Sequence, residues 1–312
     1  MRFAIFGVGA VGGYFGARLA QAGEDVAFIA RGATLRVLRA EGLRLESVNG
    51  DLWLSPVNAV EDPARLGVVD AVLVGVKTWQ VPEAAAKIKP LVGRDTIVLP
   101  LQNGVEAVGR LAAVLGGEHV CCGVAKIVSS CVRPGHVRHT GINPYIALGE
   151  CDNRRTQRIL KLRQVLQRAG IQAEIPKDIT AALWEKFLMV AAWGGIGAVS
   201  RAPIGVLRTL PRTRRLLEQA MQEVFNLARA RNVDLRKDIV AGTMAFIDSL
   251  PPAGTTSMQR DIAEGRPSEI DAWNGAVVRL GEASAVDVAL HKFVYDCLHP
   301  LELRARGEVS FS

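Results

Sequence analysis

The chain has 312 residues and a formal net charge of +7, with 49% hydrophobic and 22% charged residues. This globular composition excludes a largely disordered chain, and the length suits about two domains. The longest uncharged stretches, 3–17 and 187–200, are shorter than the ~18 residues that a membrane-spanning helix needs, so we expect no membrane partner.

The amino terminus resembles a short signal peptide, because Met1 and Arg2 precede an apolar stretch. Glycines within that stretch would break a signal helix. They are Gly7, Gly9, Gly12, Gly13 and Gly16. We therefore assign the stretch to the fold and expect a cytoplasmic protein.

Cysteines and histidines give no sign of a metal site or a disulfide framework. The cysteines are odd in number and none form a CxxC motif, so we expect buried, reduced thiols. They are Cys121, Cys122, Cys131, Cys151 and Cys297. His136 and His139 form the one close histidine pair. On a strand they would point to opposite faces, so we predict no metal.

Two arginine-rich segments, 154–168 and 208–215, are candidates for binding an anionic partner. Neither segment is interleaved with aromatic residues, and the first follows an amphipathic helical pattern. We interpret both as solvated helix faces and expect no nucleic-acid partner.

Strand-like and helix-like segments alternate in the first half of the chain. The expected strands are 2–6, 25–30, 68–76 and 96–101, and a helix is expected at 11–22. The stretch 119–148 is rich in strand-forming residues, with a turn at Pro134-Gly135. Such alternation predicts a parallel sheet with right-handed crossovers.

Long helical patterns dominate from Ile179 onward, and a proline at Ile175-Pro176 ends the preceding strand-like residues. We predict an α/β protein in which a Rossmann-type dinucleotide-binding domain, 1–175, is followed by a mainly α-helical domain, 176–312.

A glycine loop is the strongest local motif: Gly7-Val8-Gly9-Ala10-Val11-Gly12 follows a strand and opens a helix. The first glycine permits the turn, the second lets the backbone approach a diphosphate, and the third allows close packing of helix on strand. The helix amino terminus favours the anionic phosphates. The motif predicts dinucleotide binding.

Arg31 stands at the end of the second expected strand, where an NAD-preferring site usually has an acidic residue. A guanidinium matches a 2′-phosphate in charge and geometry, which favours NADP over NAD. The alternative is that Arg31 is simply solvated.

Polar residues follow two other strands, with Lys77 after 68–76 and Asn103 after 96–101. Ligands of open α/β sheets bind beyond the carboxyl ends of strands. Both side chains are therefore candidates to meet a cofactor or substrate, although each alone could equally be solvated.

Three polar residues of the second half are candidates for chemistry. Lys186 lies among large apolar residues, and a buried ammonium needs a partner or a shifted pKa, so it is a candidate acid. It could instead extend to solvent along its stem. Ser257 and Glu269 could bind substrate and orient a lysine or ribose, or could be capping and surface residues.

Together these motifs resemble the ketopantoate reductase (2-dehydropantoate 2-reductase) family over nearly the whole chain. The resemblance rests on the glycine loop, Lys77, Gln102-Asn103-Gly104, Leu183-Trp184-Glu185-Lys186, Thr256-Ser257-Met258, Glu269-Ile270-Asp271 and Asn274-Gly275. It implies an NADPH enzyme with its active site in an interdomain cleft, and a helical domain for substrate and catalysis.

The resemblance also implies residue roles. Lys186 matches the catalytic general acid, Ser257 a substrate-binding serine, and Glu269 a cofactor-contacting glutamate that organises the cleft. Asn103 matches a residue touching cofactor and substrate, and Lys77 a cofactor-side lysine. Ser130 falls in a segment that corresponds to a backbone cofactor contact.

The chain departs from the family pattern at three positions. Ketopantoate-specific members carry asparagines where this chain has Val190, Gly194 and Gly254. Each missing hydrogen bond to a polar substrate is worth ~1 kcal/mol or more, so the chemistry could survive with a changed substrate.

Three functions therefore stay open. The first is NADPH-dependent reduction of the 2-keto acid ketopantoate, a step of pantothenate biosynthesis. The second is reduction of another 2-keto acid or carbonyl compound by the same fold. The third is a non-catalytic NADP-binding sensor, favoured only by the basic run 208–215. The oligomeric state is also open, with a homodimer as one alternative.

Overall fold

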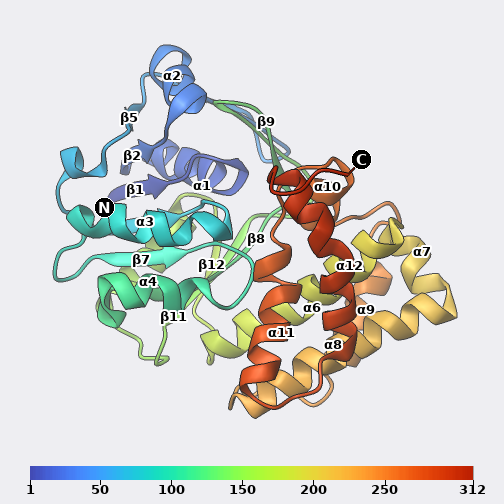
Figure 1. The fold of residues 1–312 in the computed structure, drawn as a ribbon. Helices are drawn as coiled ribbons and strands as arrows, with labels where there is room; N and C mark the ends of the chain where they lie inside the picture. The colour runs from blue at the N-terminus through green and yellow to red at the C-terminus, as the bar shows by residue number, and fades with distance from the viewer. Residues whose placement is uncertain (312) are drawn as a thin grey trace. The chain divides into compact units, whose positions relative to one another are not determined.

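A computed structural model describes residues 1–311 (Figure 1). The chain divides into two compact units. The first comprises Met1–Gln102 and Ala107–Ala182, and the second comprises Asn103–Glu106 and the chain from Leu183 onward.

A five-stranded parallel sheet forms the centre of the first unit, in the order β5-β2-β1-β6-β7. Its strands are β1 (Arg2–Phe6), β2 (Asp25–Ile29), β5 (Asn58–Val60), β6 (Ala71–Val74) and β7 (Ile97–Pro100). Alternate residues of β1 enter different cores: Phe3 and Ile5 join one apolar cluster, Ala4 and Phe6 the other. Burial on both faces explains the continuous apolar runs, and the predicted parallel sheet is confirmed.

Five α-helices and two smaller sheets complete the first unit. The helices are α1 (Ala10–Gln21), α2 (Gly32–Glu41), α3 (Val81–Ile88), α4 (Ala107–Leu115) and α5 (Gln157–Arg168). One sheet, β4-β3-β10-β9, contains β3 (Leu43–Ser47), β4 (Leu52–Leu54), β9 (Ser129–Arg133) and β10 (His136–His139). The other, β12-β11-β8, contains β8 (Cys121–Lys126), β11 (Tyr145–Glu150) and β12 (Gln172–Glu174).

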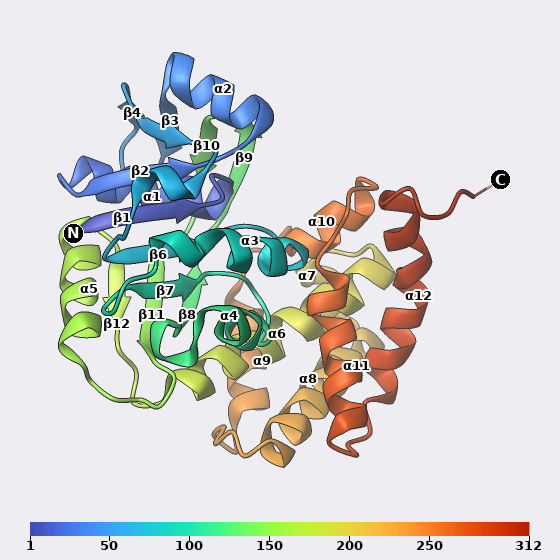
Figure 2. The same cartoon turned by 60° about the vertical axis from the view of Figure 1, so that its left-hand side comes forward.

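Helices build the second unit, as predicted (Figure 2). They are α6 (Ile179–Ser200), which starts in the first unit, α7 (Ile204–Thr209), α8 (Pro211–Ala230), α9 (Ile239–Ser249), α10 (Ser257–Ala263), α11 (Asn274–Ala283) and α12 (Ala289–Ala305). A 3₁₀ turn, η5 (Ile270–Ala272), precedes α11.

Helix α6 is long and apolar enough to cross a membrane, which the uncharged stretch 187–200 did not indicate. The helix extends that stretch backward through Glu185 and Lys186. Within the chain, 61% of its most apolar window is buried. Its hydropathy is accounted for by a core helix that is packed on several sides.

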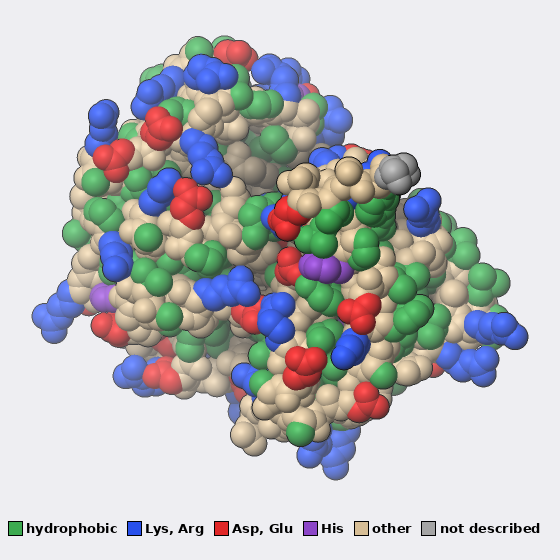
Figure 3. All heavy atoms as spheres, in the orientation of Figure 1, with side chains coloured by type: hydrophobic (Ala, Val, Ile, Leu, Met, Phe, Trp, Pro, Cys, Tyr) green, Lys and Arg blue, Asp and Glu red, His purple; other side chains and the backbone are tan. Residues whose placement is uncertain are grey.

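The arginine-rich segments are less solvated than predicted. Helix α5 has the expected apolar face, but Arg158 forms an ion pair with buried Glu150 at 2.7 Å. Arg208 donates to two backbone carbonyls, and Arg214 pairs with Asp248 at 2.7 Å. On the face drawn in Figure 3, basic side chains lie interspersed with acidic ones.

The cysteine prediction is wrong for three thiols. Cys121 and Cys122 are buried and free, but Cys131, Cys151 and Cys297 are exposed. Counting and spacing cannot place a thiol on the surface, because a turn, an edge strand or the outer face of a helix exposes residues irrespective of their polarity.

His291 is a buried centre of hydrogen bonds in the second unit. Its Nδ1 lies 3.0 Å from Nδ2 of Asn274, and its Nε2 lies 3.0 Å from the Ala220 carbonyl. Nε2 therefore carries the proton, and Nδ1 accepts from the asparagine. Burial lowers the pKa of His291 from 6.5 to about 4. The neutral ring joins α8, α11 and α12.

Acidification should therefore destabilise this unit through His291. Its pKa is lower in the folded chain, so the unfolded chain binds the proton first as pH falls below 6.5. At pH 5.5 the loss should reach about 1.4 kcal/mol relative to pH 7.5. Urea unfolding of wild type and His291→Gln at both pH values checks this. If the free energy of unfolding of His291→Gln still falls by this amount between pH 7.5 and pH 5.5, the assignment is contradicted. It is also contradicted if His299→Gln, on the same helix, removes the pH dependence.

Candidate active site

Backbone geometry at the glycine loop requires glycine at two positions. Gly7 has φ +97°, in the left-handed region, and links β1 to the turn before α1. A Cβ on Gly12 would lie 2.1 Å from the Gly7 carbonyl oxygen. The third glycine of the motif thus lets α1 pack directly against the loop.

Gly9 differs from its neighbours, because a Cβ placed there would meet no protein atom within 4 Å. Gly9 is the N-cap of α1 and provides no side-chain cap. The first-turn amides of a helix have no intrahelical partner, and the helix dipole attracts anions. Val8 is buried, whereas Ala10 and Val11 are half-buried. Open space before uncapped amides fits the diphosphate of a dinucleotide.

Arg31 follows β2 and is the N-cap of α2. Its side chain is 63% exposed and lies 3.4 Å from Glu83, which also pairs with Lys87 at 2.8 Å. Lys87 and Arg31 hold the pKa of this carboxyl below its usual value. Such exposed pairs are weak, so the guanidinium can turn to a stronger anion.

The side chain of Gln102, just after β7, binds the end of β6. Nε2 of Gln102 donates to the Val74 and Val76 carbonyls, each at 2.9 Å. This brings Lys77 just beyond the strand end, where its Nζ lies 5.8 Å from the Trp79 ring centre. The sequence alone indicates no role for Gln102, because its partners are backbone groups 28 and 26 residues away.

Ser130 is exposed on β9, which pairs with β10. Val137 of β10 packs against α1, with Cγ2 2.8 Å from the position of a Cβ on Gly13. The β9–β10 hairpin, which contains Ser130, therefore packs against α1, the helix that follows the glycine loop.

Asn103 and Glu269 belong to segments that touch within the second unit. Gly104 has φ +101°, and a Cβ there would lie 2.9 Å from the Ala272 carbonyl oxygen. Nη2 of Arg279 donates at 2.8 Å to both the Glu106 carboxylate and the Asp271 carbonyl. The turn after β7 is thus joined to η5.

Glu269 is buried, with 7% of its surface exposed, and immediately precedes η5. Its neighbour Ser268 donates its backbone N–H (2.8 Å) and its hydroxyl (2.6 Å) to Glu302 of α12. Arg306 pairs with the same carboxylate at 2.6 Å. Glu302 and Arg279 are residues that sequence reasoning missed, since neither has a local signal.

Lys186 lies two turns into α6 and is half-buried, between the two alternatives of a buried ammonium and a side chain that extends to solvent. Trp184 and Phe187 on either side are buried. Successive positions of a helix point about 100° apart, so Lys186 does not share the buried environment of these two neighbours.

Three glycines farther along α6 leave space for side chains of α10 and of the start of α11. A Cβ on Gly194 would lie 2.6 Å from the Trp273 ring, and one on Gly195 would lie 2.5 Å from Asn274. A Cβ on Gly197 would lie 2.6 Å from Gln259 of α10. Ser257, half-buried, begins α10 directly after the capping Thr256. Asn103, Lys186, Ser257 and Glu269 all belong to the second unit.

A Rossmann-type unit with this glycine loop, followed by a helical unit, is the arrangement of a dinucleotide-dependent oxidoreductase. The ketopantoate reductase PanE/ApbA family matches residues 3–153, and the C-terminal part of that family matches residues 178–302. The chain belongs to the ketopantoate reductase PanE/ApbA family.

Individual relatives agree with this assignment. A 2-dehydropantoate 2-reductase from Mesorhizobium japonicum is 33% identical, covering 90% of this chain and 91% of its own length. The structure of 2-dehydropantoate 2-reductase from Geobacter metallireducens GS-15 has TM-score 0.90 at 32% identity, covering 96% of this chain and 99% of that one. A D-mandelate dehydrogenase structure with NADH and anilino(oxo)acetate, TM-score 0.90 at 22% identity, covers 98% and 99% and shares the fold.

Gly9→Ala should separate cofactor binding from folding. The added methyl meets no protein atom, so the melting temperature should stay within about 2 °C of wild type. It enters the space assigned to the diphosphate, so the Kd for the dinucleotide should rise at least about tenfold, or ~1.4 kcal/mol. Calorimetric titration checks this, with Gly109→Ala in α4, also free of neighbours, as the control. Unchanged affinity in Gly9→Ala would exclude the loop as the diphosphate site.

Proposed function

We propose that this protein is a cytoplasmic enzyme that reduces 2-dehydropantoate to pantoate with NADPH, a step of pantothenate biosynthesis. One observation carries the proposal. The helical unit that contains Lys186 also contains Glu269, Ser257 and the Asn103 turn, in a chain whose other unit has a complete glycine loop.

The cofactor would be held by the first unit together with two residues of the second. The loop from Gly7 to Gly12 would bind the diphosphate, and Arg31 the 2′-phosphate. The remaining contacts would come from Lys77, Ser130, Asn103 and Glu269. When bound, the nicotinamide supplies the hydride that the keto carbon receives. The proposed NADP-binding domain is 1–175, and the proposed substrate and catalytic domain is 176–312.

Lys186 would complete the reduction from the second unit. Its Nζ donates a proton to the keto oxygen, or stabilises the negative charge that develops there. Carbon gains the hydride and oxygen gains the proton, so the product is the 2-hydroxy acid. Ser257 and Asn103 would hold the substrate, and buried Glu269 would orient Lys186.

A different 2-keto acid is the second candidate, favoured by the packing at Gly194. The Trp273 ring occupies the space that a side chain at position 194 would need, and Val190 is apolar and buried. At these two positions α6 thus has an apolar side chain or none, and no amide donor. A panel of 2-keto acids with apolar and polar side chains discriminates the candidates, since a higher kcat/KM for apolar ones favours the second.

Lys186→Ala should lower kcat with 2-dehydropantoate by about 10²–10⁴-fold, the usual contribution of a general acid. Because Lys186 is half-buried at one turn of a long helix, the fold should persist. Steady-state NADPH oxidation measures the loss, and dinucleotide titration verifies that the cofactor still binds. Lys177→Ala, at an exposed lysine before α6, should retain activity. Equal turnover in wild type and Lys186→Ala would remove Lys186 from this role.

Arg31→Ala should weaken NADPH selectively. Losing a charge-assisted contact worth about 1.5–3 kcal/mol should raise the KM for NADPH roughly tenfold or more. The KM for NADH, which lacks the 2′-phosphate, should change little. Side-by-side kinetics with both cofactors checks this, and Lys87→Ala, on the other side of Glu83, serves as the matched control. A parallel rise for both cofactors contradicts 2′-phosphate recognition.

A further inference from the structure

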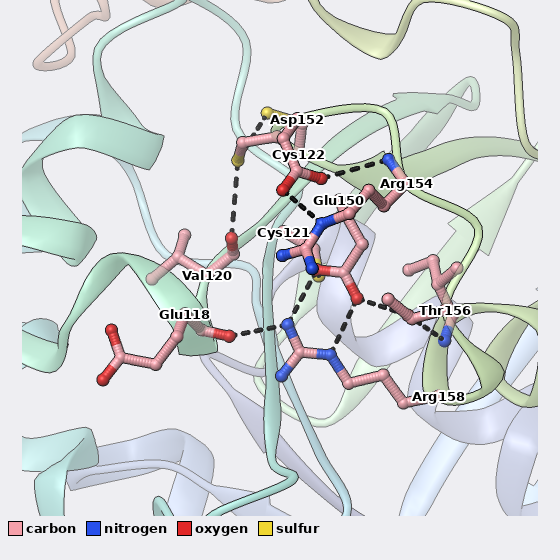
Figure 4. Close-up of polar contacts among 11 residues, drawn as sticks. Glu118, Val120, Cys121, Cys122, Glu150, Asp152, Arg154, Thr156 and Arg158 are labelled. Carbon is pink, nitrogen blue, oxygen red and sulfur yellow. Dashed lines mark hydrogen bonds and ion pairs between the residues drawn. The ribbon is translucent and has the colours of Figure 1, made fainter.

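Two cysteines meet on one face of the pair β8–β11, away from the ion pair that Glu150 of β11 forms with Arg158 of α5. In this antiparallel pair Cys121 lies opposite Glu150, and Cys122 lies opposite Gly149. Because successive residues of a strand face opposite sides, Cys122 points away from Cys121 and Glu150. Cys151 follows Glu150 in the turn after β11 and comes to the same side as Cys122. Figure 4 shows Cys121 with Glu150 and Arg158, and Cys122 apart from them.

The sulfur atoms of Cys122 and Cys151 are 3.1 Å apart. Cys151 Sγ also donates to the Val120 carbonyl at 3.4 Å, so Cys122 is the donor toward Cys151. A disulfide needs its sulfurs about 2.0 Å apart, and a change of roughly 1 Å is within reach of two χ1 rotations. We propose that Cys122 and Cys151 form a reversible intramolecular disulfide by exchange with a low-molecular-weight disulfide such as oxidised glutathione.

Exposure and charge assign the order of attack. Cys151 is exposed, and the hydrogen bond from Cys122 lowers its pKa. Cys122 is only 4% exposed, and its hydrogen bond to Cys151, together with burial, raises its pKa. The accessible, more acidic thiol meets a soluble disulfide first, since the thiolate is the nucleophile.

The exchange balances in two steps. The Cys151 thiolate attacks one glutathione sulfur, forms a mixed disulfide and releases one glutathione thiolate. Cys122 then loses its proton, and its thiolate attacks the Cys151 sulfur and releases the second. Two protein thiols are oxidised and one glutathione disulfide is reduced to two glutathione molecules.

Cys121 is excluded as the partner by its own contacts. Its Sγ donates to Oε2 of Glu150 at 3.3 Å on the opposite face. Burial and the Glu150 carboxylate raise the pKa of this thiol. Arg158 and Thr156 both donate to Glu150, which holds the carboxylate in place. Because Cys121 and Cys122 face opposite sides of β8, the sulfur of Cys121 is directed toward Glu150 and away from Cys151.

The Cys122–Cys151 disulfide would fix the loop that follows β11, against which the start of α6 packs. Ile179 packs on Gly149, with its Cβ 3.1 Å from the position of a glycine Cβ. The Ile179 N–H donates to Oδ1 of Asn153 at 2.9 Å, and the Asn153 N–H donates to the Glu150 carbonyl at 2.9 Å. Cys151 lies inside this Glu150–Asn153 turn. A link to β8 would restrain the turn, so the oxidised protein should melt at a higher temperature.

The experiment uses the full chain with Cys131→Ser and Cys297→Ser, which remove the other exposed thiols. After incubation with oxidised glutathione and alkylation under denaturing conditions, two of the three remaining thiols should be lost. Tryptic peptides 111–126 and 139–154 should be joined, and dithiothreitol should separate them. No thiol loss, a bond between two chains, or a mixed disulfide that persists at Cys151 would overturn the proposal.

Three further variants in the same background identify the sulfurs. Cys121→Ser should still join the two peptides. Cys122→Ser should stop at one bound glutathione on Cys151, because the second thiol is missing. Cys151→Ser, at an exposed position that tolerates the change, should bind no glutathione and lose no thiol. A bond that survives in Cys151→Ser or disappears in Cys121→Ser assigns the wrong pair and refutes the inference.

Discussion

The packing of the second unit depends on three glycines of α6, at positions 194, 195 and 197, where neighbouring side chains fill the space that a Cβ would need. Trp273, Asn274 and Gln259 each approach to within 2.6 Å of where a Cβ would stand. Forcing a methyl group into such a well-packed position typically costs 1–3 kcal/mol. The three contacts fix α10 and the start of α11 against the helix that carries Lys186. Gly194 belongs both to this packing and to the three positions at which the chain departs from the family pattern implied by the resemblance, so at this position packing and the proposed substrate recognition depend on the same residue.

Much of the architecture was predictable because local patterns determine it. The glycine loop, the buried strands β1, β6 and β7, and the helical second half were correctly predicted from period and composition. Strand bounds were less accurate: the run 68–76 contains the shorter strand Ala71–Val74, because Val68 is exposed in the preceding turn and Gly75 ends the pairing.

The supporting contacts of the site could not be predicted in that way. Arg279, Gln102 and Glu302 each bind partners that are not their neighbours in sequence. All three contact backbone atoms, whose positions a sequence pattern does not specify. The half-burial of Lys186 and the exposure of Cys151 depend on packing in three dimensions in the same way. Residue types predicted the candidate chemistry, whereas tertiary contacts determine how rigidly it is held.

Through the carboxylate of Glu302, the last full turn of α12 helps to hold the segment that contains Glu269. It accepts both donors of Ser268, the residue beside Glu269, and lies only three residues before the helix ends. Helix ends fray, and an amide and a hydroxyl left buried without an acceptor are costly. Removal of this turn by an exopeptidase, or its unwinding by a bulky fusion, would loosen the segment that contains Ser268 and Glu269 without disturbing the Rossmann-type unit. Affinity tags at this end of the chain therefore belong behind a spacer after α12.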